Sequence, residues 1–289
     1  MPNQNQFSAN ISEFLVDLHK IVALALEEDI RDGDVNAMLV AESATAEARV
    51  IAREPGVICG RPWFDEVFRQ LDENLELNWL VQDGDSVQAD QTLVELRGSA
   101  RTILTGERSA LNFLQALSAT ATSSRQYCEA VKDLNISVLD TRKTIPGLRL
   151  AQKYAVKIGG CQNHRIGLYD AFLIKENHIL ACGSISAAVA QAKLSRPNLP
   201  IEVETENLDE VAQCLDAGVD RIMLDNFDTT TLRLAVNLID GNAEIEISGG
   251  IEFEDFGQLD LTGIDYLSSG AITKHLTALD LSMRIQLNK

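Results

Sequence analysis

Short apolar segments alternate with longer amphipathic segments along the second half of the chain. Six segments rich in β-branched residues are typical of strands: Ile136–Asp140, Ala171–Lys175, Ile201–Glu204, Arg221–Asp225, Glu244–Ser248 and Ile264–Ser268. Amphipathic stretches with helical spacing lie between them, at Ser186–Leu194, Leu208–Ala217 and Thr230–Leu238. Asn207, with Glu210 three residues later, has the pattern of a helix start. This order of strands and helices predicts a parallel sheet with helices outside it.

Polar residues follow these strands directly. They are Asp140–Lys143, Lys175, Glu204, Asp225, Ser248, Ser268 and Ser269. The carboxyl ends of the parallel strands in a barrel share one rim, which is where active sites are built. We therefore predict an open (β/α) barrel of about six parallel strands with a functional site at that rim. No G-x-G-x-x-G opens a helix after the first strand, so a dinucleotide-binding sheet is not supported.

The first half of the chain has a different pattern. Helices are expected at about Ser12–Glu28 and Pro62–Leu71, and strands at Ala46–Arg53, Leu75–Val81 and Thr92–Arg97. A long helix is expected from about Glu107 to Val131. We therefore predict an N-terminal α+β domain with an antiparallel sheet over residues 1–117, including the start of the long helix, and a barrel domain over residues 118–289. The length of 289 residues also favours two domains over one.

Composition narrows the possible partners. The 43 acidic residues exceed the 25 basic ones and give a net charge of −18, so binding of nucleic acid through a basic face is not expected. The apolar runs fall far short of the roughly 18 residues that span a bilayer. Five scattered cysteines without C-x-x-C, and a polar, uncharged start without signal-peptide features, lead us to expect a reducing, cytoplasmic environment.

One basic region stands out in this acidic chain. Residues 141–175 contain seven Lys or Arg and one acid, Asp170. Lys153 and Lys157 fit a solvated helix face, whereas Arg142, Lys143, Arg165 and Lys175 lie at the ends of apolar segments. His164, directly before Arg165, adds a fifth potentially cationic group. Arginine pairs bidentately with carboxylate or phosphate oxygens. Five such groups predict a polyanionic ligand, such as a dicarboxylate, a pyrophosphate or both.

Carboxylates and glycines complete the candidate site. Glu204 and Asp225 end neighbouring strands and are candidates either for Mg²⁺ or for ribose hydroxyls. Ser248-Gly249-Gly250 and Ser269-Gly270 follow the last two strands, where backbone N–H groups can approach a phosphate, although either could be a plain turn.

The histidines and the long helix leave alternatives open. None of the four histidines has zinc-ligand spacing; His19 and His275 fit structural positions, His164 fits a substrate role, and His178 is left open. One face of the long helix carries Arg108, Asn112 and Gln115. That face is either simply solvated or presented to a partner subunit or to the barrel mouth.

At these residues the chain resembles a known family. The string Asp140-Thr-Arg-Lys-Thr-Ile-Pro-Gly-Leu-Arg149 is similar to the signature of quinolinate phosphoribosyltransferase, also called nicotinate-nucleotide pyrophosphorylase (carboxylating). The supporting segments are 105–112, 153–156, 163–168, 175–178, 202–204, 223–226 and 248–249, and the similarity runs from about Leu24 to Met283. Departures from the family pattern are Cys161 and Ala119 in place of glycines and Asn36 in place of threonine.

The resemblance implies a homodimer whose site is shared between subunits. It also implies an Mg²⁺-dependent transfer of phosphoribosyl from phosphoribosyl pyrophosphate to quinolinate, giving nicotinate mononucleotide, pyrophosphate and CO₂ in NAD biosynthesis. Two rival functions stay open: a related transferase with another acceptor, and a catalytically silent barrel that binds phosphosugars.

The resemblance also implies roles for residues of this sequence. Lys143, Lys175, Glu204 and Asp225 would be catalytic. The substrate-binding set would be Arg108 (from the neighbouring subunit), Thr141, Arg142, Lys143, His164, Arg165, Lys175, Glu204, Asp225, Ser248, Gly249, Gly250, Ser269, Gly270 and Ala271. Within it, Arg142, Arg165, His164 and Lys175 would pair with the quinolinate carboxylates and Lys143 with pyrophosphate. Glu204 and Asp225 would serve the ribose and Mg²⁺, and the two glycine loops would hold the 5′-phosphate.

Overall fold

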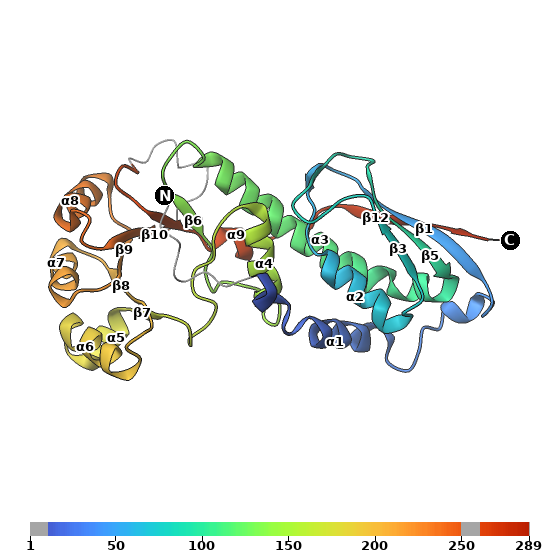
Figure 1. Cartoon of the computed structure of the whole chain (residues 1–289), viewed down its shortest axis with the longest axis horizontal. Coiled ribbons are helices and arrows are strands. Elements are labelled where there is room, and N and C mark those ends of the chain that lie inside the picture. Colours follow the sequence, from blue (N-terminus) through green and yellow to red (C-terminus); the bar gives the residue numbers. More distant parts are fainter. Residues whose placement is uncertain (1–10, 250–260, 289) are drawn as a thin grey trace. The chain divides into compact units, whose positions relative to one another are not determined.

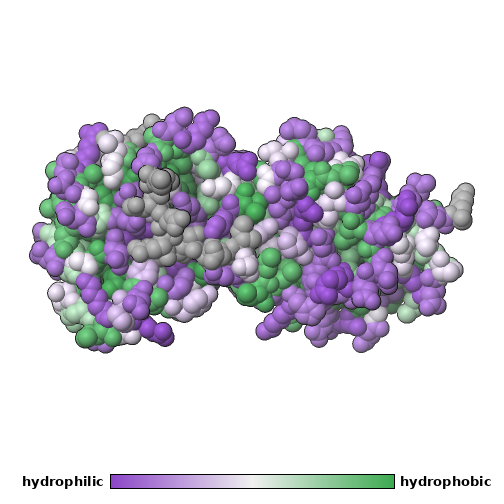
Figure 2. Space-filling view, viewed as in Figure 1, coloured by the Kyte–Doolittle hydropathy of each residue, from purple (hydrophilic) through white to green (hydrophobic). Residues whose placement is uncertain are grey.

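The computed structural model describes residues 11–249 and 261–288, and its chain divides into two compact units. We call residues 11–125, 145–160 and 273–288 the antiparallel unit, and the described residues of 126–144 and 161–272 the parallel unit. Hydrophilic residues cover much of the visible surface of both units (Figure 2), as the net charge of −18 leads one to expect. Within the described residues no helix is long and apolar enough to cross a membrane.

The antiparallel unit contains a four-stranded sheet. Its order is β12 (Leu281–Leu287), β1 (Thr45–Ala52), β5 (Thr92–Ser99) and β3 (Glu76–Trp79), with every neighbouring pair antiparallel. A short pair, β2 (Gly56–Val57) with β4 (Ser86–Val87), lies apart from it. Buried and exposed residues alternate along the first half of β1, as expected for a sheet with one wet face. The predicted antiparallel α+β architecture is confirmed.

Helices complete this unit. They are η1 (Ile11–Leu15), α1 (Leu18–Ile30), η2 (Ala37–Leu39), α2 (Arg61–Leu71), α3 (Ala100–Ala130) and α4 (Arg149–Gly159), with α3 continuing past residue 125. The helix expected over 12–28 is two pieces, a 3₁₀ turn and then α1. Helix α3 begins seven residues before the predicted Glu107, directly after β5, where the Ser99 hydroxyl accepts the Thr102 N–H at 3.4 Å.

The chain returns to the antiparallel unit twice after α3. Helix α4 and strand β12 both belong to this unit. Strand β12 pairs along its length with β1, with Met283 opposite Val50. A single domain boundary after residue 117 places α4 and β12 with the barrel domain instead. Strand β12 was not predicted, although the apolar residues at 281, 283, 285 and 287 alternate with polar ones as a strand requires.

The parallel unit is built on a six-stranded parallel sheet (Figure 1). Its order is β6 (Ser137–Leu139), β11 (Tyr266–Ser268), β10 (Glu244–Ser248), β9 (Arg221–Asp225), β8 (Ile201–Thr205) and β7 (Phe172–Ile174). All six predicted strands are present. Strands β6 and β7 form the two edges and do not pair with each other, so the barrel is open, as predicted.

Helices line one side of this sheet. Figure 1 shows α5 (Glu176–Cys182), α6 (Ile185–Ser195), α7 (Leu208–Ala217) and α8 (Thr229–Ile239) in succession, each in contact with the next; the short α9 (Ala271–Lys274) follows β11. The predicted cap of α7 is confirmed, because the Asn207 side chain accepts the Glu210 N–H at 3.0 Å. Apolar residues such as Ile222 and Ile245 are buried on one face of the strands, leaving the other face to polar residues.

Candidate active site

Strand register places the predicted rim residues at one edge of the parallel sheet. Ser248 lies directly opposite Asp225 at the ends of β10 and β9, and Glu204 lies opposite Met223, two residues before Asp225. Lys175 follows β7 directly and Ser268 ends β11. Because side chains alternate along a strand, Glu204 and Asp225 share the face that carries no helix. The structure therefore collects cations, carboxylates and hydroxyls from neighbouring strands at this rim.

Lys175 and Glu204 form a direct pair across the ends of β7 and β8. The Lys175 ammonium donates a hydrogen bond to Oε2 of Glu204, whose side chain is 14% exposed. Lys175 also begins α5, and its backbone N–H donates to Nδ1 of His178 at 3.0 Å. His178, whose role the sequence left open, therefore belongs to the capping box at the start of this helix.

The loop after β6 carries Thr141, Arg142 and Lys143. The Thr141 hydroxyl accepts the backbone N–H of Lys143 at 3.1 Å, which closes a tight turn. A Cβ atom at Gly270 would come within 2.6 Å of the Lys143 side chain, so the glycine gives that side chain room to lie against this loop. The Ser269 N–H donates to the Leu139 carbonyl at 3.0 Å. The predicted pyrophosphate lysine and the predicted phosphate loop at 269–271 are therefore adjacent.

The second glycine loop has an unusual backbone. Gly249 adopts φ 105° and the neighbouring Asn226 adopts φ 56°, while the Asn226 N–H donates to the Ser248 carbonyl at 3.1 Å. A Cβ atom at Gly249 would collide with the Asn226 amide. This close approach joins the ends of β9 and β10. Gly250 lies outside the described residues.

Two aspartates fix the segment of residues 163–171, which we call the arginine loop because it carries Arg165. Asp140, fully buried, accepts the backbone N–H of His164 at 2.9 Å and the side-chain amide of Asn163 at 2.8 Å. Asp170 accepts the N–H groups of residues 166 and 167 at 2.6 and 2.9 Å. The loop is thus held at both ends by charge-assisted hydrogen bonds.

Arg165 is largely buried in this loop, and its guanidinium donates to the Ala171 carbonyl at 3.2 Å. Burial and the nearby Arg142 lower the pKa of Arg165, while Glu202 and Asp170 oppose that shift. An anion with two carboxylates could pair with both arginines and offset their mutual repulsion.

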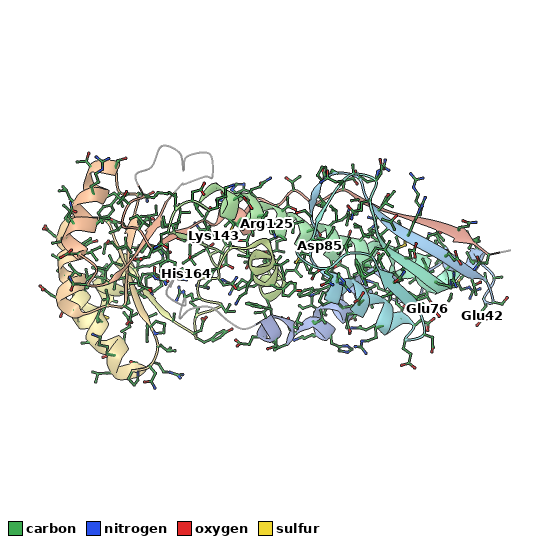
Figure 3. All side chains as sticks on the ribbon, turned by 45° about the horizontal axis from the view of Figure 1, so that its top comes forward. Glu42, Glu76, Asp85, Arg125, Lys143 and His164 are labelled. Carbon is green, nitrogen blue, oxygen red and sulfur yellow. The ribbon has the colours of Figure 1, made fainter. Side chains whose placement is uncertain are left out.

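His164 lies inside the unit rather than at the open rim (Figure 3). Its side chain is 6% exposed, and its Nε2 atom lies 2.8 Å from Glu202 and 3.6 Å from Glu246. Its Nδ1 atom accepts the backbone N–H of Arg165 at 2.7 Å. Both ring nitrogens therefore face protein groups, and a direct contact with substrate stays a prediction.

The buried charged residues around His164 were not predicted from the sequence. Glu202, Arg221 and Glu246 are each 0% exposed, and Arg221 lies 3.1 Å from Glu246 and 2.9 Å from Glu244. Burial is the main cause that raises the pKa of both Glu202 and Glu246. The available signal was the alternation of charged and apolar residues within 201–205, 221–225 and 244–248, which places the charges on one strand face.

Arg108 lies in the antiparallel unit. It is exposed on α3 and lines a shallow pocket with Asn112, Phe113, Glu28 and Asp29. Gln115 is half-buried and holds the chain before β12, because its carbonyl accepts the Leu279 N–H at 3.2 Å. On the polar face of α3, Gln115 thus has a structural contact, whereas Arg108 is exposed to solvent.

Family models match nearly the whole chain. The quinolinate phosphoribosyl transferase N-terminal domain matches residues 34–118, and the C-terminal domain of the same family matches residues 120–284. The chain belongs to the quinolinate phosphoribosyl transferase family.

The chain matches named relatives in this family over almost their full length. A probable nicotinate-nucleotide pyrophosphorylase [carboxylating] of Bacillus subtilis is 39% identical over 94% of this chain and 95% of its own. The corresponding protein of Synechocystis is 42% identical over 91% of this chain and 90% of its own. The solved structure of the nicotinate-nucleotide pyrophosphorylase from Francisella tularensis is 44% identical, covers 98% of this chain and 100% of its own, and superimposes with a TM-score of 0.91.

The departures from the family pattern cause no visible disruption. Cys161 and Ala119 are buried, and burial raises the pKa of the Cys161 thiol. Gly160, one residue earlier, takes the left-handed conformation that ends α4, with φ 112°. A glycine is therefore not needed at position 161.

The rim of this family member carries oxygen ligands of the kind that Mg²⁺ prefers. Glu204 and Asp225 present carboxylates from adjacent strands, and both are partly exposed. Mg²⁺ keeps several waters and binds through one or two carboxylates together with substrate phosphates. Among the described residues, the three potential ligands that lie within 4.8 Å of one another are instead His164, Glu202 and Glu246.

Proposed function

We propose that this protein transfers the phosphoribosyl group of phosphoribosyl pyrophosphate to the ring nitrogen of quinolinate, forming nicotinate mononucleotide, pyrophosphate and CO₂ for NAD biosynthesis. The observation that carries the proposal is the proximity of Arg142 and Arg165. Arg142 follows β6, and Arg165 follows Gln162, which bridges β6 at Leu139. Family membership and the names of the relatives support the same reaction.

Quinolinate carries two adjacent carboxylates. Arg142 and Arg165 bind one or both of them through bidentate pairs, and Lys175 adds a third positive charge. Binding a dianion removes the repulsion between the two arginines, so the empty site favours a doubly charged acceptor over nicotinate. His164 supports this set from the arginine loop.

The donor occupies the other side of the rim. Lys143 faces the pyrophosphate, and the backbones of 248–250 and 269–271 hold the 5′-phosphate with Thr141 close by. Glu204 and Asp225 contact the ribose and hold Mg²⁺, which neutralises charge on the pyrophosphate. Lys175 lies against Glu204 and thereby links the acceptor and donor sides.

In the first step, the bond from the ribose C1′ to pyrophosphate breaks and a bond from C1′ to the pyridine nitrogen forms. The leaving oxygen gains negative charge, which Lys143 stabilises, and the ribose becomes cationic, which Glu204 and Asp225 stabilise. Preorganised groups of this kind are typically worth about 3–4 kcal/mol each.

In the second step, the carboxylate next to the ring nitrogen leaves as CO₂. The electron pair of the broken bond stays on the ring carbon, where the positive charge of the ribosylated nitrogen stabilises it, and that carbon then takes a proton from water. No separate decarboxylation cofactor is needed. The residues that hold the remaining carboxylate keep the ring in place during this step.

The active protein is a homodimer in this proposal. Arg108 reaches the acceptor of the neighbouring subunit, which gives a role to its exposed position on α3. The enzyme works in the cytoplasm with reduced cysteines and without nucleic acid or membrane partners. The acidic surface and the five free cysteines support this environment.

The decisive experiment is a reaction of purified protein with phosphoribosyl pyrophosphate, Mg²⁺ and quinolinate, following nicotinate mononucleotide and CO₂ together. Parallel reactions contain nicotinate or no acceptor. Equal amounts of both products, formed with quinolinate only, are the expected result. Turnover with another acceptor would favour a related transferase, and donor binding without any turnover would favour a silent phosphosugar-binding barrel.

A further inference from the structure

Four charged or titratable side chains form a continuous buried network beneath the rim. Arg221 contacts Glu246 at 3.1 Å, and Glu246 lies 3.6 Å from His164. His164 in turn lies 2.8 Å from Glu202. None of the four residues exceeds 4% exposure. We call this set the buried network.

Strand register explains how these residues meet. Glu202, Arg221 and Glu244 lie opposite one another in β8, β9 and β10, and Glu246 lies one layer nearer the rim. All of them project from the strand face that carries no helix. Interiors of parallel barrels are normally filled by branched apolar side chains. Buried ions cost several kcal/mol each unless they are well paired, and apolar replacements are often at least as stabilising. Core packing alone therefore does not account for this network.

The network connects to the proposed acceptor site through one side chain. The Nδ1 atom of His164 accepts the backbone N–H of Arg165, so the proton of the neutral ring is on Nε2, which lies 2.8 Å from Glu202. The same ring thus ties the arginine loop to β8 and β10. Asp140 and Asp170 hold the loop backbone, and His164 fixes the point from which the Arg165 side chain starts.

We propose that Glu202, Glu246 and Arg221 are positioning residues that act through His164 to place the guanidinium of Arg165 for the carboxylates of the acceptor. This inference rests on the proposed function. It assigns His164 to the support of the site. It also gives the two buried glutamates a role that needs no bound metal, because Arg221 already supplies a positive charge to Glu246.

A double-mutant cycle between His164 and Glu202 tests the proposal. His164→Asn retains an acceptor for the Arg165 N–H but is too short to reach Glu202, and Glu202→Gln removes the charge that holds the ring. Each single variant should raise KM for quinolinate by roughly ten- to a hundredfold, since small misplacements carry costs of that order. KM for phosphoribosyl pyrophosphate should stay within about twofold, and the double variant should be no worse than the worse single variant.

A conservative replacement separates the two possible roles of His164. Glutamine can place an amide N–H close to the position of Nε2 and so keep the link to Glu202, while Asp140 and Asp170 still hold the loop backbone without the Nδ1 acceptor. His164→Gln should therefore recover KM for quinolinate to within about threefold of the unmodified protein. A histidine that bound the acceptor as a cation would lose the same affinity with Gln as with Asn. Equal losses for Gln and Asn, or additive effects in the cycle, would overturn the proposal.

Controls keep the result interpretable. Asp216→Asn removes an exposed carboxylate from α7 of the same unit and should leave both KM values unchanged. If Glu202→Gln does not fold, Glu202→Asp keeps the charge, withdraws it from Nε2 and should show the same selective rise in KM. A stoichiometric divalent ion in the purified protein that Glu202→Asp releases would assign the cluster to a metal and also overturn the proposal. Failure of the proposed function would be seen separately, as absence of quinolinate turnover in the unmodified protein.

Discussion

The guanidinium of Arg221 lies 3.8 Å from the centre of the Tyr266 ring, and the same side chain contacts Glu246 at 3.1 Å. Stacking and ion pairing therefore hold one fully buried arginine between β9, β10 and β11. Removal of Arg221 would leave the buried carboxylate of Glu246 without this positive charge, which is destabilising.

Arg221→Met is expected to destabilise the protein by about 3–5 kcal/mol, the cost typical of breaking a buried pair by removing one partner. Chemical denaturation of the two proteins measures the difference. Arg53→Met is the matched control, because Arg53 contacts Asp90 at 3.5 Å on the surface. Its cost should stay below about 1 kcal/mol. Similar costs for both variants would show that the buried network contributes little to stability.

Arg142→Ala should lower kcat/KM for quinolinate by at least about a hundredfold, because a charge-assisted bidentate pair in a partly buried site is lost. Steady-state kinetics with each substrate varied in turn measures this. Arg196 is exposed before β8, at the opposite end of the strands, and provides a matched arginine. Arg196→Ala should behave as the unmodified enzyme. Unchanged kcat/KM for Arg142→Ala would remove that residue from the acceptor site.

Gly249→Ala should raise KM for phosphoribosyl pyrophosphate by about tenfold, because the left-handed backbone costs Ala about 1–2 kcal/mol and its methyl group collides with Asn226. Gly241 offers a close control. It also has a positive φ, 72°, but a Cβ there meets no atom within 4 Å. Gly241→Ala should therefore lower stability slightly and leave KM unchanged. Equal KM values for the two variants would argue against a phosphate role for the 248–250 loop.

Mixing two inactive variants tests whether Arg108 acts across a subunit boundary. Arg108→Ala and Arg142→Ala should each lose activity, whereas their co-expression should restore about a quarter of the sites, because half of the C2 dimers are mixed and each has one intact site. Activity per dimer after co-purification measures the recovery. A mixture of Arg142→Ala with Lys143→Ala should show none, because both residues belong to the same chain's site. No recovery with Arg108→Ala would place its action within its own subunit.

The sequence predicted most of the fold but only part of the site. All six parallel strands were found because each is a short β-branched segment that ends in a polar residue. Strand β12 was missed although Leu281, Met283 and Ile285 alternate with polar residues, because its partner β1 lies more than 200 residues earlier. Pairing over such a distance leaves no local mark in the sequence.

The buried network could not be predicted for a different reason. A glutamate that alternates with isoleucine has the pattern of a strand with one solvated face, so the pattern alone does not show that Glu202 and Glu246 are buried. Only the order of the six strands shows that this face is enclosed. His164 was predicted to belong to the functional region, but its neighbours on β8 and β10 decide which way its ring points.

Glu66 gives a prediction for acid stability. Its carboxylate is 7% exposed on α2 and accepts hydrogen bonds from Arg69 at 2.7 Å and Gln70 at 2.6 Å, with His19 at 2.7 Å. Burial acts to raise the pKa of Glu66, but these partners outweigh it and lower the pKa to about 2. A lowered pKa stabilises the folded state at pH values above the unfolded pKa, 4.5, and this contribution is lost as the pH falls toward about 2.

Glu66→Gln should therefore destabilise the antiparallel unit by about 2 kcal/mol at pH 7, less than the full shift implies, because Arg69 and His19 are exposed and screened by solvent. The difference in unfolding free energy should stay constant from pH 7 to about pH 4.5 and shrink below that value. Denaturant titrations at several pH values measure it. Glu95→Gln, an exposed glutamate on β5 of the same unit, is the control and should show a small difference at every pH. A Glu66→Gln difference that persists unchanged below pH 4 would mean that Glu66 stabilises α2 through packing rather than through its charge.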